Sequence, residues 1–409
     1  MSFQQGLSGL NGASRALDAI SNNVANSTTV GFKQSGALFA DMFASSLSSS
    51  AGGQIGIGTS VNAVAQQFTQ GNLTATNNPL DVAINGQGFF RLSDNGDIVY
   101  ARDGQFSVDK NGYVVNPSGR RLTGYAADAN GNIVPAAPVD LQVNSADLTP
   151  LATANATVAL NLDSRSSAPT VAPFSATDTR TFNTSSSVTT FDTLGNPHVL
   201  SMYFVKSATP NTWDLYTTLD GGGAAGPTSM DFTTTGGLSG IGGVAGTSTV
   251  AQSFAINTGA VTTFDFTLDF ATTTQYGSSF GVNSMSQDGY SSGRLSGLTV
   301  GDDGVIMGRY SNGQSRNLGQ IVLANFRAPG GLIQLGDNRW AESATSGPPL
   351  VGAPNTGSLG VLQSGATEDS NVDLTAELVA MITQQRSYQA NAQSIKTEDS
   401  LLQTLVSLR

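Results

Sequence analysis

The stretch from residue 366 to residue 409 contains neither glycine nor proline, although the chain of 409 residues has 48 glycines and 14 prolines elsewhere. These two residues are the strongest breakers of regular helix, so their absence over so long a segment predicts one long C-terminal helix. Ser370 and Asp373 supply a capping signal near its start. We therefore expect the C-terminal end to form a helix that is more nearly self-supporting than the N-terminal segment.

The predicted C-terminal helix carries a repeat whose positions alternate steps of four and three. Most of these positions hold large apolar side chains, which is typical of a coiled-coil seam, although Gln385 and Asp399 interrupt it. A terminal helix docked on its own domain is the alternative. The repeat consists of Leu374, Leu378, Met381, Gln385, Tyr388, Ala392, Ile395, Asp399, Leu402 and Val406.

The N-terminal segment has a repeat with the same alternating spacing of four and three. The repeat consists of Phe3, Leu7, Leu10, Ser14, Leu17, Ser21 and Val24. It also contains Gly6, Gly9 and Gly12, each of which costs about 1 kcal/mol of helix propensity relative to alanine. This helix is therefore marginal in isolation. The same glycines leave one face with little bulk, so that another helix can approach closely. We expect the termini to be largely disordered in the free monomer and helical when subunits pack, with the N-terminal helix the more dependent on assembly.

The middle of the chain predicts β structure. Between residues 81 and 125, short apolar runs are separated by Asn-Gly, Asp-Gly and Ser-Gly pairs, which are hairpin signals, and a comparable block spans residues 295–326. Residues 151–284 are rich in Thr, Ser, Ala and Gly with patchy apolar alternation, which favours a separate β domain; a partly disordered segment is the alternative. Within it, we expect residues 221–246 to be loops.

The predicted fold class is α+β and mainly β. Long terminal helices form a coiled-coil-like assembly domain, and two antiparallel β domains follow, one inserted in the other. The expected domains are residues 1–75 with 360–409 for the helical part, 76–147 with 285–359 for the first β domain, and 148–284 for the inserted outer β domain.

Composition excludes several functional classes. Only 11% of residues are charged and the formal net charge is −11 with 18 Lys plus Arg, which disfavours nucleic-acid binding because that requires clustered cations. No run approaches the roughly 20 apolar residues that span a bilayer, so we expect no membrane insertion. No signal peptide is evident at the N-terminus. The absence of cysteine excludes disulfides, thiolate metal sites and cysteine nucleophiles.

No motif predicts catalysis, a cofactor or a metal site. His198 is the single histidine and follows a turn, so we interpret it as a polar residue that begins a strand. The Asp302-Asp303 pair lacks calcium-loop spacing and suits a hairpin turn. Residues 237–246 lack the ending of a phosphate loop. The basic pair Arg120-Arg121 is too small for a nucleic-acid groove.

Several runs of residues resemble the bacterial flagellar rod and hook proteins. Residues 17–26 (LDAISNNVAN) and 29–33 (TVGFK) resemble the N-terminal signature of that family, and residues 370–374 (SNVDL) and 385–391 (QRSYQAN) its C-terminal end. Residues 81–90 (DVAINGQGFF) and 102–106 (RDGQF) resemble its shared β domain. The signature positions are Asn22, Asn23, Ala25, Asn26, Gly31, Phe32, Gln385, Tyr388 and Asn391.

The length of the chain, with residues 191–198 (FDTLGNPH) and 319–326 (GQIVLANF), looks more like the hook than the shorter rod proteins. The resemblance implies a curved tube of many copies that acts as a universal joint carrying torque from rod to filament, with the terminal helices lining its channel. It also implies export through the flagellar apparatus to the outside of the cell, and contact with the distal rod protein, the hook cap and the hook-filament junction protein. A distal rod protein, or a carbohydrate-binding or adhesive β protein, is the alternative.

Overall fold

The computed structural model describes residues 2–42, 56, 58–144 and 146–407, and it divides into two compact units. Unit 1 consists of Met1–Ser145, Gly297–Arg309 and Ser315–Arg409, and unit 2 of Ala146–Ser296 and Tyr310–Gln314. Within the described part of the chain, no helix is both long and apolar enough to cross a membrane.

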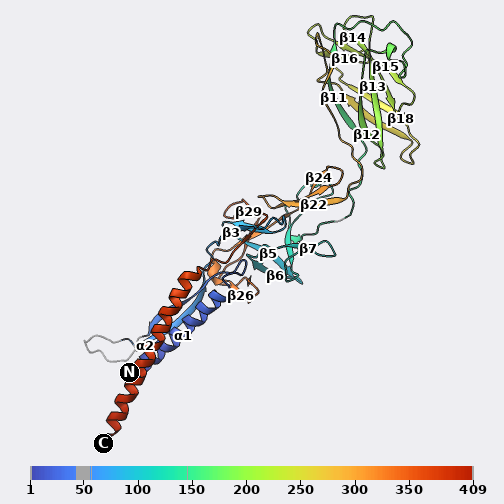
Figure 1. Cartoon of the computed structure of the whole chain (residues 1–409). Helices are drawn as coiled ribbons and strands as arrows, with labels where there is room; N and C mark the ends of the chain where they lie inside the picture. The colour runs from blue at the N-terminus through green and yellow to red at the C-terminus, as the bar shows by residue number, and fades with distance from the viewer. Residues whose placement is uncertain (1, 43–55, 57, 145, 408–409) are drawn as a thin grey trace. The chain divides into compact units, whose positions relative to one another are not determined.

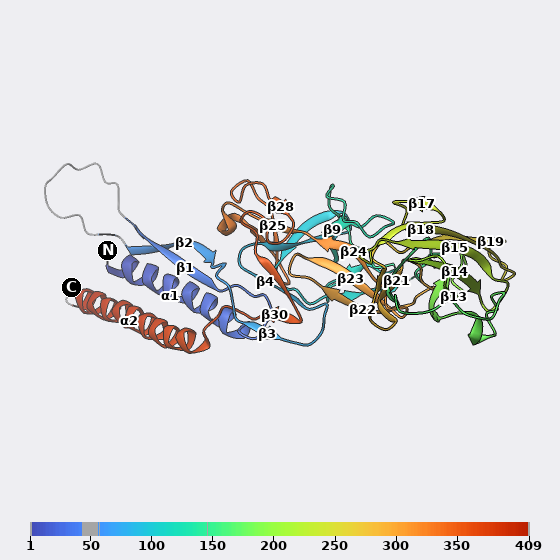
Figure 2. The same ribbon diagram turned by 90° about the horizontal axis from the view of Figure 1, so that it is seen from above.

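Two helices form one part of unit 1, α1 (Ser2–Ala25) and α2 (Leu374–Ser407). They lie side by side and run in opposite directions (Figures 1 and 2). Asp373 caps α2, because its Oδ1 accepts hydrogen bonds from the backbone N–H groups of Thr375 and Ala376 at 2.9 and 3.2 Å.

The start of α2 corrects the sequence prediction, which began the helix at residue 366. Residues 366–368 instead form the buried strand β30, which pairs with β3. The lack of glycine and proline permits a helix here, but the partner strand and the burial of all three side chains decide against one.

The strands of unit 1 include a two-stranded sheet of β1 and β2 beside the helices and a 13-stranded sheet ordered β22-β23-β24-β9-β5-β6-β27-β26 along its main path. Asn95 and Gly96, both with positive φ, join β5 to β6 as the sequence predicted. The strands are β1 (Ser35–Met42), β2 (Gly58–Gln66), β3 (Leu73–Ala75), β4 (Val82–Asn85), β5 (Phe89–Asp94), β6 (Asp97–Ala101), β7 (Ser107–Val108), β8 (Val114–Val115), β9 (Arg121–Ala126), β10 (Val139–Asp140), β22 (Leu295–Val300), β23 (Val305–Tyr310), β24 (Ser315–Ile321), β25 (Leu323–Asn325), β26 (Ile333–Gly336), β27 (Arg339–Ala341), β28 (Leu350–Gly352), β29 (Val361–Ser364) and β30 (Ala366–Glu368), with a short 3-10 helix η2 (Pro329–Gly331).

An aromatic cluster forms one part of the core of unit 1. Phe89 contacts Trp340 edge-on with ring centroids 5.7 Å apart, and Tyr100 contacts Phe326 in the same way at 4.8 Å. All four side chains are buried. Trp340 also donates its indole N–H to Gln66 at 2.6 Å, which fixes β2 to this core.

Unit 2 is built from two sheets around one core. A six-stranded antiparallel sheet is ordered β12-β13-β14-β15-β16-β17, and a five-stranded sheet contains β18, β19, β11, β20 and β21. Side chains from both sheets, including Leu160, Phe204, Trp213 and Leu268, make the core. The elements are β11 (Asn155–Asp163), η1 (Thr179–Thr181), β12 (Thr184–Phe191), β13 (Pro197–Lys206), β14 (Thr212–Leu219), β15 (Ala225–Phe232), β16 (Leu238–Ile241), β17 (Val244–Ala245), β18 (Thr249–Ala255), β19 (Thr263–Asp269), β20 (Thr274–Tyr276) and β21 (Gly281–Gln287).

Two features of unit 2 differ from the sequence expectations. Residues 221–246, expected to be loops, contain strands β15, β16 and β17, because Met230, Phe232 and Ile241 supply buried side chains. The five-stranded sheet is mixed, since β11 pairs with β19 and β20 in parallel. Unit 2 also includes residues 285–296 and 310–314, and β21 pairs with β11 within it.

Candidate assembly site

The two terminal helices meet through small residues of α1. A Cβ atom added to Gly6 would lie 2.9 Å from Cγ1 of Ile395, and one added to Gly9 would lie 2.8 Å from the amide nitrogen of Asn391. Gly12 faces Phe39 of β1 instead, with a Cβ distance of 3.2 Å. The three glycines therefore permit close packing, two of them against α2 and one against the β1–β2 sheet.

The large apolar side chains of the predicted seam occupy other positions. Phe3 and Leu7 of α1 are exposed, while the buried positions of that helix are small, namely Gly6, Gly12, Ala13 and Ala16, together with Asn23. Among the remaining predicted seam residues, the exposed ones are Leu374, Leu378, Tyr388, Leu402 and Val406, and the half-buried ones are Leu10, Leu17, Val24, Met381 and Ile395. Much of the apolar seam is thus left uncovered by the contact between the two helices.

A buried ion pair lies where the helices join the β strands. Lys33 Nζ is 2.6 Å from Glu368 Oε1, and the side chains of both residues are 0% exposed. Lys33 also donates to the carbonyl oxygen of Thr69 at 2.7 Å. Glu368 Oε1 accepts in addition from the backbone N–H of Gly71 at 2.9 Å, so this carboxylate connects β30 to two segments far away in the sequence.

A second cation completes the cluster. Arg102 Nη1 lies 3.3 Å from Glu368 Oε2 without hydrogen-bond geometry, and its Nη2 donates to the carbonyl oxygen of Gly86 at 2.8 Å. Burial lowers the pKa of the Lys33 ammonium group, while Glu368 opposes this change and Arg102 adds to it. A buried charge is costly unless it is paired, so each cation depends on this one carboxylate.

An amide network continues from the ion pair to the start of α2. Asn23 donates to Glu377 Oε1 at 3.1 Å and to the carbonyl oxygen of Ser35 at 2.8 Å, and it accepts from the Ser35 N–H at 2.9 Å. Asn371 accepts from the Gln34 backbone N–H at 2.7 Å. These bonds tie the end of α1, the start of β1 and the start of α2 to one another.

The predicted signature positions have different surroundings, and only some of them lie at this junction. Gly31 has a φ of 71°, and an added Cβ would lie 2.7 Å from the backbone nitrogen of Asp103. Asn26 donates to the carbonyl oxygen of Asn22 and accepts from Thr29. Of the other signature residues, Phe32 and Asn23 are buried, Asn391 contacts α1 at Gly9, and Ala25, Gln385 and Tyr388 are exposed.

The charged residues at the junction could not be recognised as a cluster from local sequence patterns. Lys33 and Arg102 occur in the family-like motifs without a role of their own, and Glu368 lies outside those motifs. Composition was the one signal for them: in a chain with only 11% charged residues, a cation inside an apolar motif such as TVGFK is expected to have a buried partner.

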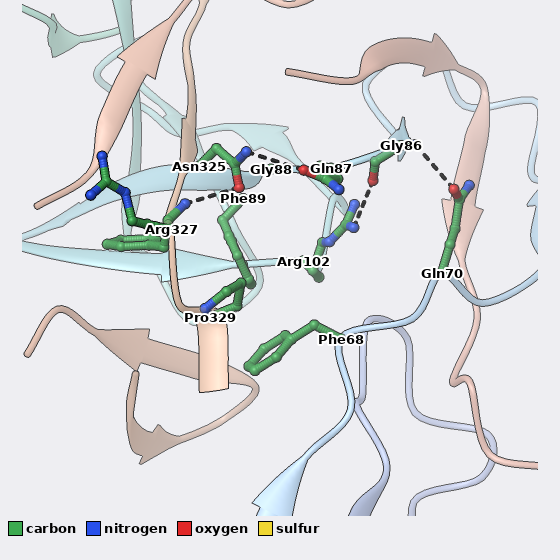
Figure 3. A pocket seen from close by; sticks show the side chains of 11 residues that line it. Phe68, Gln70, Gly86, Gln87, Gly88, Phe89, Arg102, Asn325, Arg327 and Pro329 are labelled. Atoms are coloured by element: carbon green, nitrogen blue, oxygen red, sulfur yellow. Dashed lines mark hydrogen bonds between the residues drawn. The ribbon is translucent and has the colours of Figure 1, made fainter. Parts of the chain in front are cut away.

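A cavity of about 370 Å³ lies beside the junction (Figure 3). Its aromatic lining is Phe68, Phe89 and Phe326, and Arg102 lies at its wall with one guanidinium nitrogen bonded to Gly86. The residues described around it include no carboxylate, histidine or lysine. The lining therefore lacks a general acid, a general base or an activated nucleophile.

His198 is the sequence candidate with the most developed surroundings. It lies near the start of β13 and is buried, with Nδ1 2.6 Å from Asp220 and Nε2 3.4 Å from Asp192. Burial opposes its positive charge, but the hydrogen bonds to the two carboxylates outweigh burial and raise the pKa of His198. Thr258 donates to Asp192 at 2.7 Å and not to the imidazole, so His198 does not activate this hydroxyl group.

The remaining sequence candidates hold structural roles. Asp303 accepts from the Val305 N–H in the turn between β22 and β23. Arg120 pairs with Asp94 at 2.8 Å, and Arg121 pairs with Asp140 at 3.0 Å. Among the residues that the structure describes, no group of three or more His, Asp or Glu side chains is arranged to hold a metal ion.

Comparison with known proteins agrees with the resemblance noted in the sequence. Family models match residues 3–33 (Flagella basal body rod protein), 83–157 (Flagellar hook protein FlgE/F/G D1 domain), 161–290 (Flagellar basal body protein FlaE D2 domain) and 363–408 (Flagellar basal body rod FlgEFG protein C-terminal). The models thus match both ends of the chain and both β regions.

Full-length relatives and one solved structure agree with these matches. The chain is 43% identical to the flagellar hook protein FlgE of Escherichia coli (strain K12), with 100% of both chains covered, and 33% identical to that of Borreliella burgdorferi, with 100% of this chain and 99% of the relative covered. The crystal structure of Helicobacter pylori flagellar hook protein FlgE2 is similar in fold, with 13% identity, a TM-score of 0.50, and 72% of this chain and 99% of that chain covered. The chain therefore belongs to the family of bacterial flagellar hook proteins, which are structural subunits and not enzymes.

Proposed function

We propose that this chain polymerises into the curved tube of the flagellar hook through the outward apolar faces of α1 and α2. The observation that carries the proposal is the exposure of large apolar side chains on both helices, among them Phe3, Leu7, Leu378 and Val406. Contiguous exposed apolar surface usually marks an interaction site. Every copy presents the same faces, so burial of this surface against neighbours stabilises a polymer at roughly 25 cal/mol per Å² removed from water.

The buried junction supports a mechanical role for the same helices. The Lys33–Glu368 ion pair and the Asn23–Glu377 contact join residues 335 and 354 positions apart in the sequence. Force on the helices is therefore transmitted to the β strands through several buried bonds. A subunit of a torque-carrying joint requires such a connection, since its inner helices must not rotate independently of the rest of unit 1.

The finer assignments follow from the family. We place the polymer in the hook outside the cell surface, after export through the flagellar apparatus, with its helices toward the central channel. Its partners in this proposal are the distal rod protein, the hook cap and the hook-filament junction protein. Pull-down of each purified partner by the assembled polymer, with monomer as the control, tests this list; a partner retained equally by both is not specific to the hook.

Electron microscopy after addition of ammonium sulfate tests polymerisation directly. The unaltered chain is expected to form curved tubes, whereas Leu378→Ser with Val406→Ser is expected to remain monomeric, because both changes remove apolar surface without altering a buried contact. Thr404→Ser, also exposed on α2, is the matched control. Straight tubes would favour a rod protein, and saturable sugar binding by a monomer would favour an adhesive protein.

Two further measurements test whether the helices of unit 1 build the tube while unit 2 determines its curvature or stiffness. Deletion of unit 2 is expected to preserve tubes and change their curvature or stiffness; loss of every polymer would contradict the proposal. Circular dichroism is expected to show more helix in polymer than in monomer, because α1 contains three glycines and depends on its neighbours. Equal helix content would show that the termini are ordered before assembly.

A further inference from the structure

Helix α2 extends beyond the start of α1. It has 34 residues against 24 in α1, and the two helices run in opposite directions with Gly6 against Ile395. At 1.5 Å per residue, α2 continues about 18 Å past Ile395, whereas α1 continues only about 6 Å past Gly6. About 12 Å of α2 therefore project beyond its partner. Figures 1 and 2 show this projecting end of α2 beyond the start of α1.

The projecting end of α2 keeps the apolar stripe that faces α1 elsewhere. Met381, Ala392 and Ile395 are half-buried along this stripe. Continuing in steps of four and three from Ile395, the stripe reaches Asp399, which interrupts it, and then Leu402 and Val406 in the last two turns. These two side chains are 54% and 78% exposed, because α1 has ended and no longer covers them.

A second apolar patch lies at the other end of the same helix. Leu374 and Leu378 are each 45% exposed, and Val379 and Ile382 are more so. Between the patches the exposed positions are mostly polar, including Gln385, Arg386, Gln389, Gln393 and Lys396. The apolar surface of α2 is thus concentrated at its two ends.

We propose that the two patches bind one another between copies of the chain, with Leu402 and Val406 of one copy against Leu374 and Leu378 of the next. Leu402 lies 28 residues after Leu374, and Val406 lies 28 residues after Leu378. A displacement of neighbouring α2 helices by about 42 Å along their axes therefore brings both pairs together at once. Because different patches meet, the contact is head to tail and leaves a free patch at each end of the assembly.

A second copy is the occupant that fits these observations. The contact rests on the proposed polymer, in which every subunit supplies both patches in equal number. A head-to-tail contact that does not close produces a helical filament and not a closed dimer, as a tube requires. The contact also covers the part of the α2 stripe that α1 is too short to cover within one subunit.

Cysteine cross-linking of the full-length chain tests the contact, since the natural sequence has no cysteine. Leu378→Cys and Val406→Cys are prepared separately, mixed in equal amounts, polymerised with ammonium sulfate and oxidised. The mixture is expected to give covalent dimers and each variant alone to give none. A disulfide requires Cα atoms within about 7 Å, so the two positions cannot be linked inside one chain, where they lie about 42 Å apart.

Matched variants make the outcomes decisive. In the control mixture, Gln393→Cys, at an exposed position between the patches, replaces Leu378→Cys as the partner of Val406→Cys. The mixture of Leu378→Cys with Val406→Cys is expected to give at least about ten times the dimer yield of this control, because a disulfide forms only over a short distance. Leu374→Cys with Leu402→Cys repeats the test if a first variant fails to assemble, and a variant carrying both cysteines is expected to give a ladder of covalent oligomers.

The results separate this contact from polymerisation itself. Tubes without cross-linked dimers, dimers from one variant alone, or a yield equal to the Gln393 control would each overturn the contact while leaving the polymer intact. Absence of tubes from the unaltered chain would overturn the proposed function and the contact with it.

Discussion

Removal of the Glu368 charge is the sharpest test of the buried junction. Glu368→Gln preserves the shape of the side chain and an oxygen for the Gly71 N–H, but it leaves Lys33 and Arg102 without their carboxylate. The side chains of Lys33 and Arg102 are 0% and 4% exposed, so water cannot replace the lost partner. Breaking a buried pair in this way typically costs about 3–5 kcal/mol, which lowers the ratio of folded to unfolded unit 1 by at least about a hundredfold.

The free energy of unfolding of unit 1 can be measured separately from that of unit 2. The chain has two tryptophans, Trp340 in unit 1 and Trp213 in unit 2. In a Trp213→Phe background, tryptophan fluorescence during urea unfolding reports unit 1 alone. Asp140→Asn is the control, because it breaks a partly exposed ion pair of the same unit and should cost about 1 kcal/mol or less.

The pH dependence of the Glu368→Gln variant provides a second check. Burial already lowers the pKa of Lys33, and loss of Glu368 removes the interaction that opposes this. When the folded pKa lies below the unfolded one, the unfolded state binds more protons between the two values, so stability rises with pH. The deficit of the variant should therefore shrink between neutral and alkaline pH. A deficit under about 1 kcal/mol at neutral pH, or one equal to that of Asp140→Asn, would refute the reasoning.

Three further predictions address other parts of the molecule. Unit 2 should lose stability as pH rises through the raised pKa of His198, because the charged imidazole contributes its full stabilisation only below pH 6.5. The urea midpoint of unit 2, read from the fluorescence of Trp213, should fall as pH rises through this pKa. His198→Gln should remove this pH dependence. Gly31→Ala should destabilise unit 1 more than Gly119→Ala. Both glycines have positive φ, which costs alanine about 1–2 kcal/mol, but only at Gly31 would the added Cβ also meet backbone atoms. Urea unfolding compares the two variants, and equal losses of stability would contradict the steric argument. Gly6→Leu should abolish tubes in electron micrographs by separating α1 from α2, whereas the exposed control Asn11→Leu should retain them.

Features of short sequence range could be predicted. The breaker-free C-terminal segment indicated α2, and Asp373 was recognised as part of its capping signal. The Asn95-Gly96 pair marked a hairpin because its backbone conformation is determined within a few residues. The family was recognised because its motifs are themselves local runs of residues.

The prediction of loops at residues 221–246 was wrong because it also relied on local sequence alone. Glycine-rich sequence lowers local strand propensity, so the segment was interpreted as loop. Strands β15 and β16 form nonetheless, because Met230 and Ile241 pack into the core of unit 2 and their backbones pair across the sheet. Tertiary contacts outweighed propensity here.

The sequence by itself determined that both ends of this chain can form helices with apolar positions at heptad spacing, since helix and spacing depend on neighbouring residues. Only the tertiary structure decided which faces the helices bury. It turned Gly6 and Gly9 toward α2 and left Leu378 and Val406 in solvent. It also brought Lys33 to Glu368 across 335 residues, because a buried charge requires a partner wherever the returning chain supplies one.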